Sequence, residues 1–466
     1  MKEDYIKLIF GLKLKQIRTG KGLSLSGLSK ETGLSKSYLN EIENGKKYPK
    51  PEKISLLSNH LDHSYDDLVS LKLDKNLAPI GDILQSKLLK EIPLELFGLK
   101  ESTLINIIAT APKKVTAFIT TIIEIAKNYD FSKENFYLAS VRSYQEASYN
   151  FFQHLEDAVV NFLKVYNIEL SQPIKSKELE TILKEEFSYT IINEALQSYN
   201  ELEDLRSIYI PKTKTLLITK NIDDAQRSFI YAKELAYCYL NFNYRLYTFP
   251  WIKFDNFEQV LNNFYASYFA GSLLIPRNKI INDLKQIFSS EQFSPSDFEA
   301  LFDRYNASPE TVYQRLTNIL PHDFNLTNLF FLRFSYNTET DYYSLNKELH
   351  LAKEQSPSAN ETNEHYCRRW VSLKVLKNIT ANSSDHEFDI QISNYPEDEQ
   401  KYLVLSSAVK DPFKENIYRS ISIGIGVDSK LSKKINFIKD ENIKRIDVGI
   451  TCETCGIQNC EVREVP

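Results

Sequence analysis

Residues 229–240, FIYAKELAYCYL, place a glutamate where a zinc-binding helix of the H-E-x-x-H type has its catalytic base. In such a helix two histidines, four residues apart, bind the metal. Their positions are here occupied by Lys233 and Tyr237, while Glu234 keeps the position of the base. A catalytic zinc needs three protein ligands and an open position for water, and without that water Glu234 has nothing to deprotonate. The stretch therefore predicts a helix without hydrolytic activity, with Glu234 as a surface or ion-paired residue.

The cysteines near the end of the sequence form a second group that could do chemistry. Cys452, Cys455 and Cys460 are spaced C-x2-C-x4-C, and Cys367 lies upstream in YCRRW. A C-x2-C turn lets two thiolates reach one metal, so these four cysteines are candidate ligands. An iron–sulfur cluster, a zinc ion and unliganded thiols all remain open, because ligand identity alone does not separate them. Cys238, on the motif helix, is expected to be a core residue.

The first seventy residues predict several short helices, two of them arranged as a helix-turn-helix. Gly33 lies where the tight turn needs a glycine, Ser35 caps the next helix, and Gly45 ends it. That helix would enter the major groove of double-stranded DNA with its N-terminal end first. A small helical bundle that binds protein is the alternative. The side chains expected to contact bases, sugars or phosphates are Ser35, Lys36, Ser37, Tyr38, Asn40, Lys46 and Lys47.

Composition supports a globular protein with several domains. The chain has 466 residues, of which 42% are hydrophobic and 26% charged. Residues 1–75 carry 14 lysines and arginines against 10 aspartates and glutamates, a balance of +4, so the remainder carries −9 of the total of −5. A basic unit joined to an acidic body favours contact with nucleic acid. No apolar run reaches membrane-spanning length and the first residues lack a signal peptide, so a cytoplasmic location without a membrane partner is expected.

The middle and the end of the chain differ in their patterns. Tyr144, Phe151, Leu155, Val159 and Phe162 form an apolar stripe along one predicted helix, which is more typical of a core than of a cofactor site. From about residue 325, runs rich in β-branched and aromatic residues predict strands of an α+β domain. These runs are NLFFLRFSY, EFDIQIS, YLVLSSAV, SISIGIGV and KINFIK.

Three resemblances follow from these motifs. The run GLS-x-SYL-x-x-IENGK-x-x-P resembles the DNA-binding domain of the λ-repressor/Cro-like (XRE) family. The order of SIYIPKTKTLLITKN, the motif helix and FYASYFAGSLLIPRNKI resembles the ImmA/IrrE-like metallopeptidases, whose third, acidic zinc ligand would correspond to Tyr265. YFAGSLLIPR, YNASPETVYQRLTNILP, FFLRF and YCRRW resemble the short-chain fatty acyl transcriptional regulators.

The last resemblance implies a transcription regulator, not an enzyme, that responds to short-chain acyl-CoA and controls acetate, propionate or fatty-acid metabolism. It also implies an iron–sulfur cluster at the C-terminal cysteines. Tyr237 and Tyr265 would then fill the space of the lost metal site. An ImmA/IrrE-like stress regulator or a phage-type repressor, with no or vestigial peptidase activity, is the alternative. Binding of acyl-CoA needs cations for its phosphates and an apolar slot for its acyl group. Within the stretches that carry the resemblance, the candidate ligand-binding residues are Arg227, Tyr268, Phe269 and Arg277.

The resemblances imply a multidomain fold, mainly α with α+β parts. The predicted order is a λ-repressor-like helix-turn-helix bundle, a linker, a helical region, a degenerate zincin-like body and a C-terminal α+β domain with the cysteine cluster. Because such repressors bind paired half-sites, the helical region is a candidate for homodimerisation. The corresponding ranges are 1–75, 76–100, 101–165, 166–322 and 323–466.

Overall fold

A computed structural model of the chain describes residues 2–70, 133–194, 205–220, 222–245, 256–351, 365–396 and 399–464, with a few single positions between them. The predicted linker 76–100 and the first part of the predicted helical region lie almost wholly outside the described residues. Two compact units divide the chain, residues 1–140 and residues 141–466.

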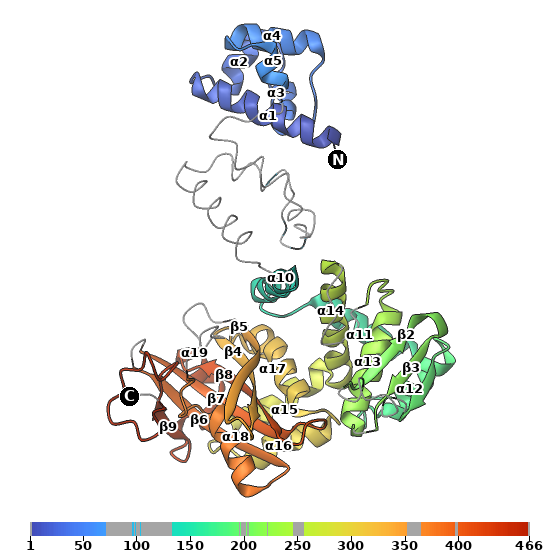
Figure 1. Cartoon of the computed structure of the whole chain (residues 1–466), viewed down its shortest axis with the longest axis vertical. Helices are drawn as coiled ribbons and strands as arrows, with labels where there is room; N and C mark the ends of the chain where they lie inside the picture. The colour runs from blue at the N-terminus through green and yellow to red at the C-terminus, as the bar shows by residue number, and fades with distance from the viewer. Residues whose placement is uncertain are drawn as a thin grey trace. The chain divides into compact units, whose positions relative to one another are not determined.

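The first unit contains a small helical bundle (Figure 1). Its helices are α1 (Lys2–Gly20), α2 (Leu25–Thr32), α3 (Lys36–Glu43), α4 (Pro51–Leu61) and α5 (Tyr65–Val69). Gly33 joins α2 to α3 with a φ of 70°, a left-handed conformation that favours glycine, and Ser35 Oγ accepts from Tyr38 N at 3.1 Å. The predicted turn and cap are therefore present. Arg18 and Glu43 form a buried ion pair that fixes α1 against the end of α3.

The second unit begins with a mainly helical body that carries a small sheet. Its strands β1 and β3 are parallel, and β2 runs antiparallel to β3. The elements are α10 (Lys133–Ala147), which starts in the first unit, α11 (Gln153–Val165), α12 (Ser176–Glu185), β1 (Thr190–Asn193), β2 (Ser207–Ile210), η4 (Pro211–Thr213), β3 (Thr215–Ile218), α13 (Asp224–Tyr239), α14 (Phe257–Leu274), α15 (Arg277–Ser289), α16 (Pro295–Arg304) and α17 (Pro309–Phe324).

A six-stranded sheet follows, in the order β5-β4-β8-β7-β6-β9. All neighbouring strands are antiparallel except β6 and β9. Gly424 of β8 lies beneath the ring of Phe330, where a Cβ would approach ring carbons to 2.2 Å. The elements are β4 (Leu329–Asn337), β5 (Tyr342–His350), α18 (Val371–Asn382), β6 (His386–Tyr395), β7 (Gln400–Lys410), β8 (Ile417–Gly426), α19 (Ser429–Lys434), η5 (Asn436–Lys439) and β9 (Lys444–Asp447).

The two faces of this sheet pack against different helices (Figure 1). Phe331, Leu405 and Ile423 belong to the same buried cluster as the helices of the body, including α17. Phe330 and Val404, which point to the other face, pack with α18. The hydrophobic core is therefore continuous between the body and the six-stranded sheet.

Two local predictions were wrong. The stripe from Tyr144 to Phe162 is divided between α10 and α11, because the chain turns between them at Tyr149 and Asn150, both with positive φ. Leu155, Val159 and Phe162 are nevertheless buried inside the second unit, so the prediction that these positions belong to a core is confirmed. KINFIK forms the 3-10 turn η5 instead of a strand, because its apolar side chains pack into the core beside α15.

Candidate functional site

The predicted DNA-contacting residues lie together on α3 and the loop after it. Ser35, Lys36, Ser37, Asn40, Lys46 and Lys47 are exposed, and Tyr38 is half-buried. The Nζ of Lys47 lies 5.3 Å from the centre of the Tyr38 ring. Leu39 and Ile42, on the opposite side of α3, are fully buried and hold the helix against the bundle. The helix therefore presents a polar surface with its N-terminal end free of covering side chains from the described part of the bundle.

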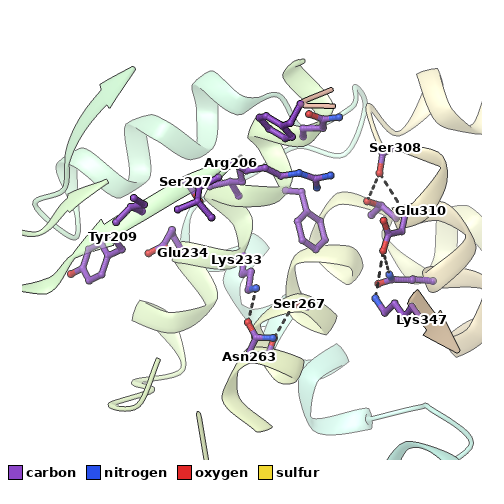
Figure 2. Close-up of a pocket in the computed structure, with 18 of the residues that line it drawn as sticks. Arg206, Ser207, Tyr209, Lys233, Glu234, Asn263, Ser267, Ser308, Glu310 and Lys347 are labelled. Carbon is purple, nitrogen blue, oxygen red and sulfur yellow. Dashed lines mark hydrogen bonds and ion pairs between the residues drawn. The ribbon is translucent and has the colours of Figure 1, made fainter. Parts of the chain in front are cut away.

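The two motif positions on α13 converge on one residue of α14. Lys233 Nζ donates to Asn263 Oδ1 at 2.7 Å (Figure 2), and Tyr237 OH donates to the same oxygen at 3.4 Å. Asn263 therefore lies where a third ligand from the later helix would have to be. Tyr265, the residue predicted there, instead shares a hydrogen bond with Tyr144 OH at 3.0 Å and packs beside Phe152. That prediction was wrong.

Glu234 is ion-paired, as one of the two predicted alternatives had it, and it is 9% exposed. Its carboxylate pairs with the guanidinium of Arg245 and accepts from Tyr189 OH at 2.9 Å. The Arg245 guanidinium lies between the rings of Tyr209 and Tyr237, at 4.0 and 4.5 Å from their centres. Burial would lower the pKa of Arg245, but the adjacent Glu234 charge raises it above its ordinary value. An arginine cation thus lies directly beside the carboxylate at the position of the catalytic base.

A pocket of about 640 Å³ opens over these residues, between α13 and the six-stranded sheet (Figure 2). Its apolar lining includes Phe229, Ile230 and Phe413, and its charged lining is mostly cationic. Against the two carboxylates of Glu234 and Glu310, the described lining places six cationic side chains, which are Arg206, Lys233, Arg245, Arg333, Lys347 and Arg419.

The two lining carboxylates do not neutralise this excess of positive charge, although Arg419 also pairs with the buried Asp411 outside the lining. Glu310 is held by Arg333 at 3.0 Å and by Lys347 at 3.5 Å. Burial would raise the pKa of Glu310, but the two cations outweigh it and lower the pKa to about 2. The Nε of Arg333 is buried without a hydrogen-bond partner among the described residues, and Arg206 makes no side-chain hydrogen bond or ion pair with them. The pocket is therefore suited to a polyanionic ligand.

The four predicted metal-binding cysteines border one small space. Cys367, Cys452, Cys455 and Cys460 all line it, and burial raises the pKa of the Cys367 thiol. Within the described residues, however, no group of three or more histidine, cysteine or acidic side chains is close enough to hold a single metal ion. The four thiols thus surround one space, but they are not close enough together to form the ligand sphere of a single ion.

The loop that carries three of these cysteines is fixed from within. The Arg463 guanidinium donates to the carbonyl oxygens of Cys452, Cys455 and Ile457 at 2.8–3.1 Å. Close packing fixes it as well, because a Cβ on Gly449 would lie 2.7 Å from Cys455 Sγ.

Three family models match the chain. A helix-turn-helix model matches residues 14–68, an IrrE N-terminal-like domain matches residues 185–317, and a model described as short-chain fatty acyl coenzyme A regulator, C-terminal, matches residues 353–466. The chain combines three domains of known families. All three predicted resemblances are confirmed, as is the multidomain fold of mixed α and β content. The XRE-type head and the acyl-regulator domain together make the chain a DNA-binding transcription regulator.

No curated protein matches the chain. One similar solved structure is a Mycobacterium tuberculosis transcriptional regulator, with 17% identity over 70% of this chain and 93% of the other, and a TM-score of 0.49. Among the described residues of the regulator, no helix has the length and apolarity needed to cross a membrane.

The four residues predicted to bind the ligand lie elsewhere in the IrrE-like body and its helices. Tyr268 donates to Glu156 at 2.8 Å, and Phe269 is fully buried in the core. Arg227 donates to Asn193 at 2.8 Å, and Arg277 pairs with Asp323. None of the four is among the described residues that line the pocket.

The sequence contained one indication of the pocket, but recognising it requires knowing which residues of neighbouring strands lie opposite each other. Arg333 interrupts the apolar strand FFLRF, and in the β4–β5 pairing it lies directly opposite Lys347. Like charges at opposing positions destabilise a sheet unless an anion lies between them, and here both cations pair with Glu310.

Proposed function

We infer that this DNA-binding regulator takes a short-chain acyl-CoA as its effector and binds it in the pocket between α13 and the six-stranded sheet. The main support for this proposal is that six cationic side chains line the pocket, against only two anionic ones. CoA brings several phosphate charges, which bind most strongly to guanidinium and ammonium groups. The match of the C-terminal domain to short-chain fatty acyl coenzyme A regulators supports the same effector.

The lining suggests how the ligand is oriented. Arg206 lies just before β2, whereas Arg333 on β4 and Arg419 on β8 belong to the six-stranded sheet; these three would bind phosphates. Phe229, Ile230 and Tyr237 on α13 offer apolar contacts for a short acyl chain. In this orientation the thioester lies near Lys233, at the position of the lost metal.

We further infer that the regulator has no peptidase activity. Lys233, Tyr237 and Asn263 supply no set of zinc ligands, and Glu234 is engaged by Arg245 and Tyr189. This arrangement disfavours an IrrE-like protease regulator. A phage-type repressor has no evident need for a cationic pocket or for the C-terminal domain.

Arg206→Ala should weaken the binding of acetyl-CoA or propionyl-CoA by about 1.5–3 kcal/mol, roughly 10- to 100-fold, because one charge-assisted contact to phosphate is lost. Arg206 has no ion partner among the described residues, so the fold should be unaffected. Isothermal titration calorimetry measures the effect, and Lys285→Ala, on the exposed side of α15, is the control. An unchanged affinity in Arg206→Ala, or no binding by the native protein, would show that the pocket is not the acyl-CoA site.

An effector must also bind one state of the regulator more tightly than another, or it cannot regulate. Operator affinity measured with and without saturating acyl-CoA should therefore differ for the native protein. The difference should be lost in Arg206→Ala at the same ligand concentration. Equal operator affinity under both conditions would contradict the proposed regulation.

The seven predicted residues on and after α3 are proposed as the DNA contacts. Lys36→Ala and Asn40→Ala should each weaken specific binding by about 1–3 kcal/mol, because each removes a contact near the base edges. Lys47→Ala should weaken binding to all sequences and reduce its dependence on salt, because it removes a phosphate contact. Fluorescence anisotropy with specific and random duplexes separates the two effects. Equal losses on both duplexes in Lys36→Ala and Asn40→Ala would rule out base reading by these residues.

The four C-terminal cysteines are proposed to bind an iron–sulfur cluster, with zinc as the alternative. The cysteine ligands of an iron–sulfur cluster lie further apart than those of a single zinc ion. The four thiols here surround one space without approaching a common point closely, and this spacing favours the cluster. Cys455→Ser should lose the bound metal and lower the thermal midpoint of the second unit. Iron, zinc and sulfide analysis of protein purified without oxygen tests this, with Cys238→Ser as the control. Normal metal content in Cys455→Ser would contradict the assignment.

We propose in addition that the regulator acts in the cytoplasm as a homodimer on paired half-sites, with the domain boundaries predicted above. Analytical ultracentrifugation of the protein with a single half-site and with a paired site tests the stoichiometry. One protein chain on the paired site would contradict a dimer.

A further inference from the structure

Lys233 is the amine that the pocket places beside the expected thioester of the effector. It comes from α13 at the first of the two lost histidine positions, and it lines the pocket (Figure 2). Its Nζ donates to Asn263 Oδ1, an uncharged acceptor, at 2.7 Å. The neighbouring carboxylate of Glu234 is instead taken up by Arg245. The ammonium group is therefore held in position without being locked into an ion pair.

The surroundings of Lys233 favour loss of its proton. Burial lowers the pKa of Lys233, the charge of Glu234 on α13 opposes this, and the charge of Lys347 on β5 adds to it, so that the pKa is about 8. The other charged groups in the same pocket are Glu310 at the start of α17, Arg206 just before β2, Arg245, Arg333 on β4 and Arg419 on β8. A pKa of about 8 leaves roughly a tenth of the amine neutral at pH 7, far more than an ordinary lysine with a pKa of about 10.4.

We propose that Lys233 accepts the acyl group of a bound acyl thioester, so that the regulator acylates itself within its effector pocket. The proposal rests on the proposed function, because the thioester is the effector named there. It makes Lys233 a modification site that records exposure to the effector covalently.

The reaction needs no oxidant or further co-reactant. The neutral amine attacks the thioester carbonyl carbon, a C–N bond forms, and the C–S bond breaks. The sulfur leaves with the bonding electron pair as a thiolate, and the proton released from nitrogen converts it to the thiol. Asn263 Oδ1 accepts from the amine N–H before the reaction and can accept from the amide N–H after it, so the product keeps the same anchor.

The modification would change the charge of the pocket as well as its shape. One of the six cationic side chains becomes neutral, while Arg206, Arg333 and Arg419 remain to hold phosphates. The short acyl chain then occupies the space beside Tyr237 and Ile230. CoA released by the reaction would bind to a pocket that no longer has room for a second acyl group.

The test follows the full-length protein by mass spectrometry during incubation with acetyl-CoA or propionyl-CoA, in parallel with calorimetric titration of ligand binding. We expect one acyl group per chain, mapped by peptide analysis to Lys233, at a rate at least 10-fold above that of the exposed Lys285. The rate should rise with pH, reach half of its maximum near pH 8 and level off about one pH unit above that, since the neutral fraction of Lys233 does so. Lys233→Arg keeps the charge and should stay unmodified, whereas Lys347→Arg removes the other pocket lysine and should still be acylated at Lys233.

The outcomes separate this inference from the proposed function. If acyl-CoA binds but Lys233 reacts no faster than Lys285, self-acylation is overturned and the effector assignment stands. If acylation in native protein maps to Lys347, the site is wrong. If acyl-CoA neither binds nor modifies the protein, both proposals fail.

Discussion

Arg315→Ala should lower the free energy of unfolding of the second unit by about 3–5 kcal/mol, because it leaves a buried carboxylate without its cation. The Arg315 side chain is fully buried and donates to both oxygens of Glu156, at 2.5 and 2.9 Å. Its Nε donates to the carbonyl oxygen of Ile275 at 3.1 Å. This one side chain on α17 therefore ties α11 to the end of α14. Urea unfolding followed by circular dichroism measures the loss.

Two further variants identify the cause of this loss. Arg304→Ala removes a more exposed ion pair with Asp283 and should cost less than about 1 kcal/mol. The double variant Arg315→Met with Glu156→Leu replaces the buried pair by apolar groups and should recover most of the stability. A loss below 1 kcal/mol in Arg315→Ala would show that the pair is not a main support of the unit.

Lowering the pH should remove the stabilising contribution of the ion pair between Arg315 and Glu156. Burial would raise the pKa of Glu156, but the charge of Arg315 and hydrogen bonds from Arg315, Tyr268 and Ser272 hold it below its ordinary value. A carboxyl group with a depressed pKa in the folded state stabilises the fold above its unfolded pKa, and this stabilisation is lost as the pH falls through the folded value. The stability difference between native protein and Arg315→Ala should therefore shrink below about pH 4.

The DNA-binding head was predictable because its signals are local. Gly33 needs a positive φ, and the Ser35 side chain caps α3 by accepting from the N–H of Tyr38, three residues further along. Neighbouring residues alone therefore determine these features. The buried pair of Arg18 with Glu43 was not predicted, because it joins residues that only the packed bundle brings together.

The pocket could not be predicted in the same way. Arg206, Arg333, Lys347 and Arg419 come from four separate segments, and their approach depends on sheet register. The error at the third motif position is a matter of helical geometry. Asn263 and Tyr265 are two residues apart, which on an α-helix turns the side chain by about 200°, so they point in nearly opposite directions. Tyr268 and Phe269 lie in a recognisable block, but that block packs inside the protein.

Restoring the three converging positions should create a zinc site. The triple variant Lys233→His, Tyr237→His and Asn263→Asp should bind one Zn²⁺ per chain, because the two helix positions are four residues apart and both reach the Asn263 side chain in the native protein. Zinc at 100 times its dissociation constant should then stabilise the second unit by about 2.7 kcal/mol relative to the metal-free variant. Equilibrium dialysis and thermal unfolding with and without zinc measure both effects.

The matched control carries the same two histidines with Tyr265→Asp in place of Asn263→Asp. It should not bind zinc tightly, because the Tyr265 side chain points toward Tyr144 and away from the two histidine positions. Peptide hydrolysis should stay absent even in the zinc-binding variant, since Arg245 still pairs with Glu234 and keeps that carboxylate from acting as a base. Adding Arg245→Ala would release Glu234 and is the step at which hydrolysis could return. Equal zinc affinity in the Asn263 and Tyr265 variants, or none in either, would show that the third position has been placed wrongly.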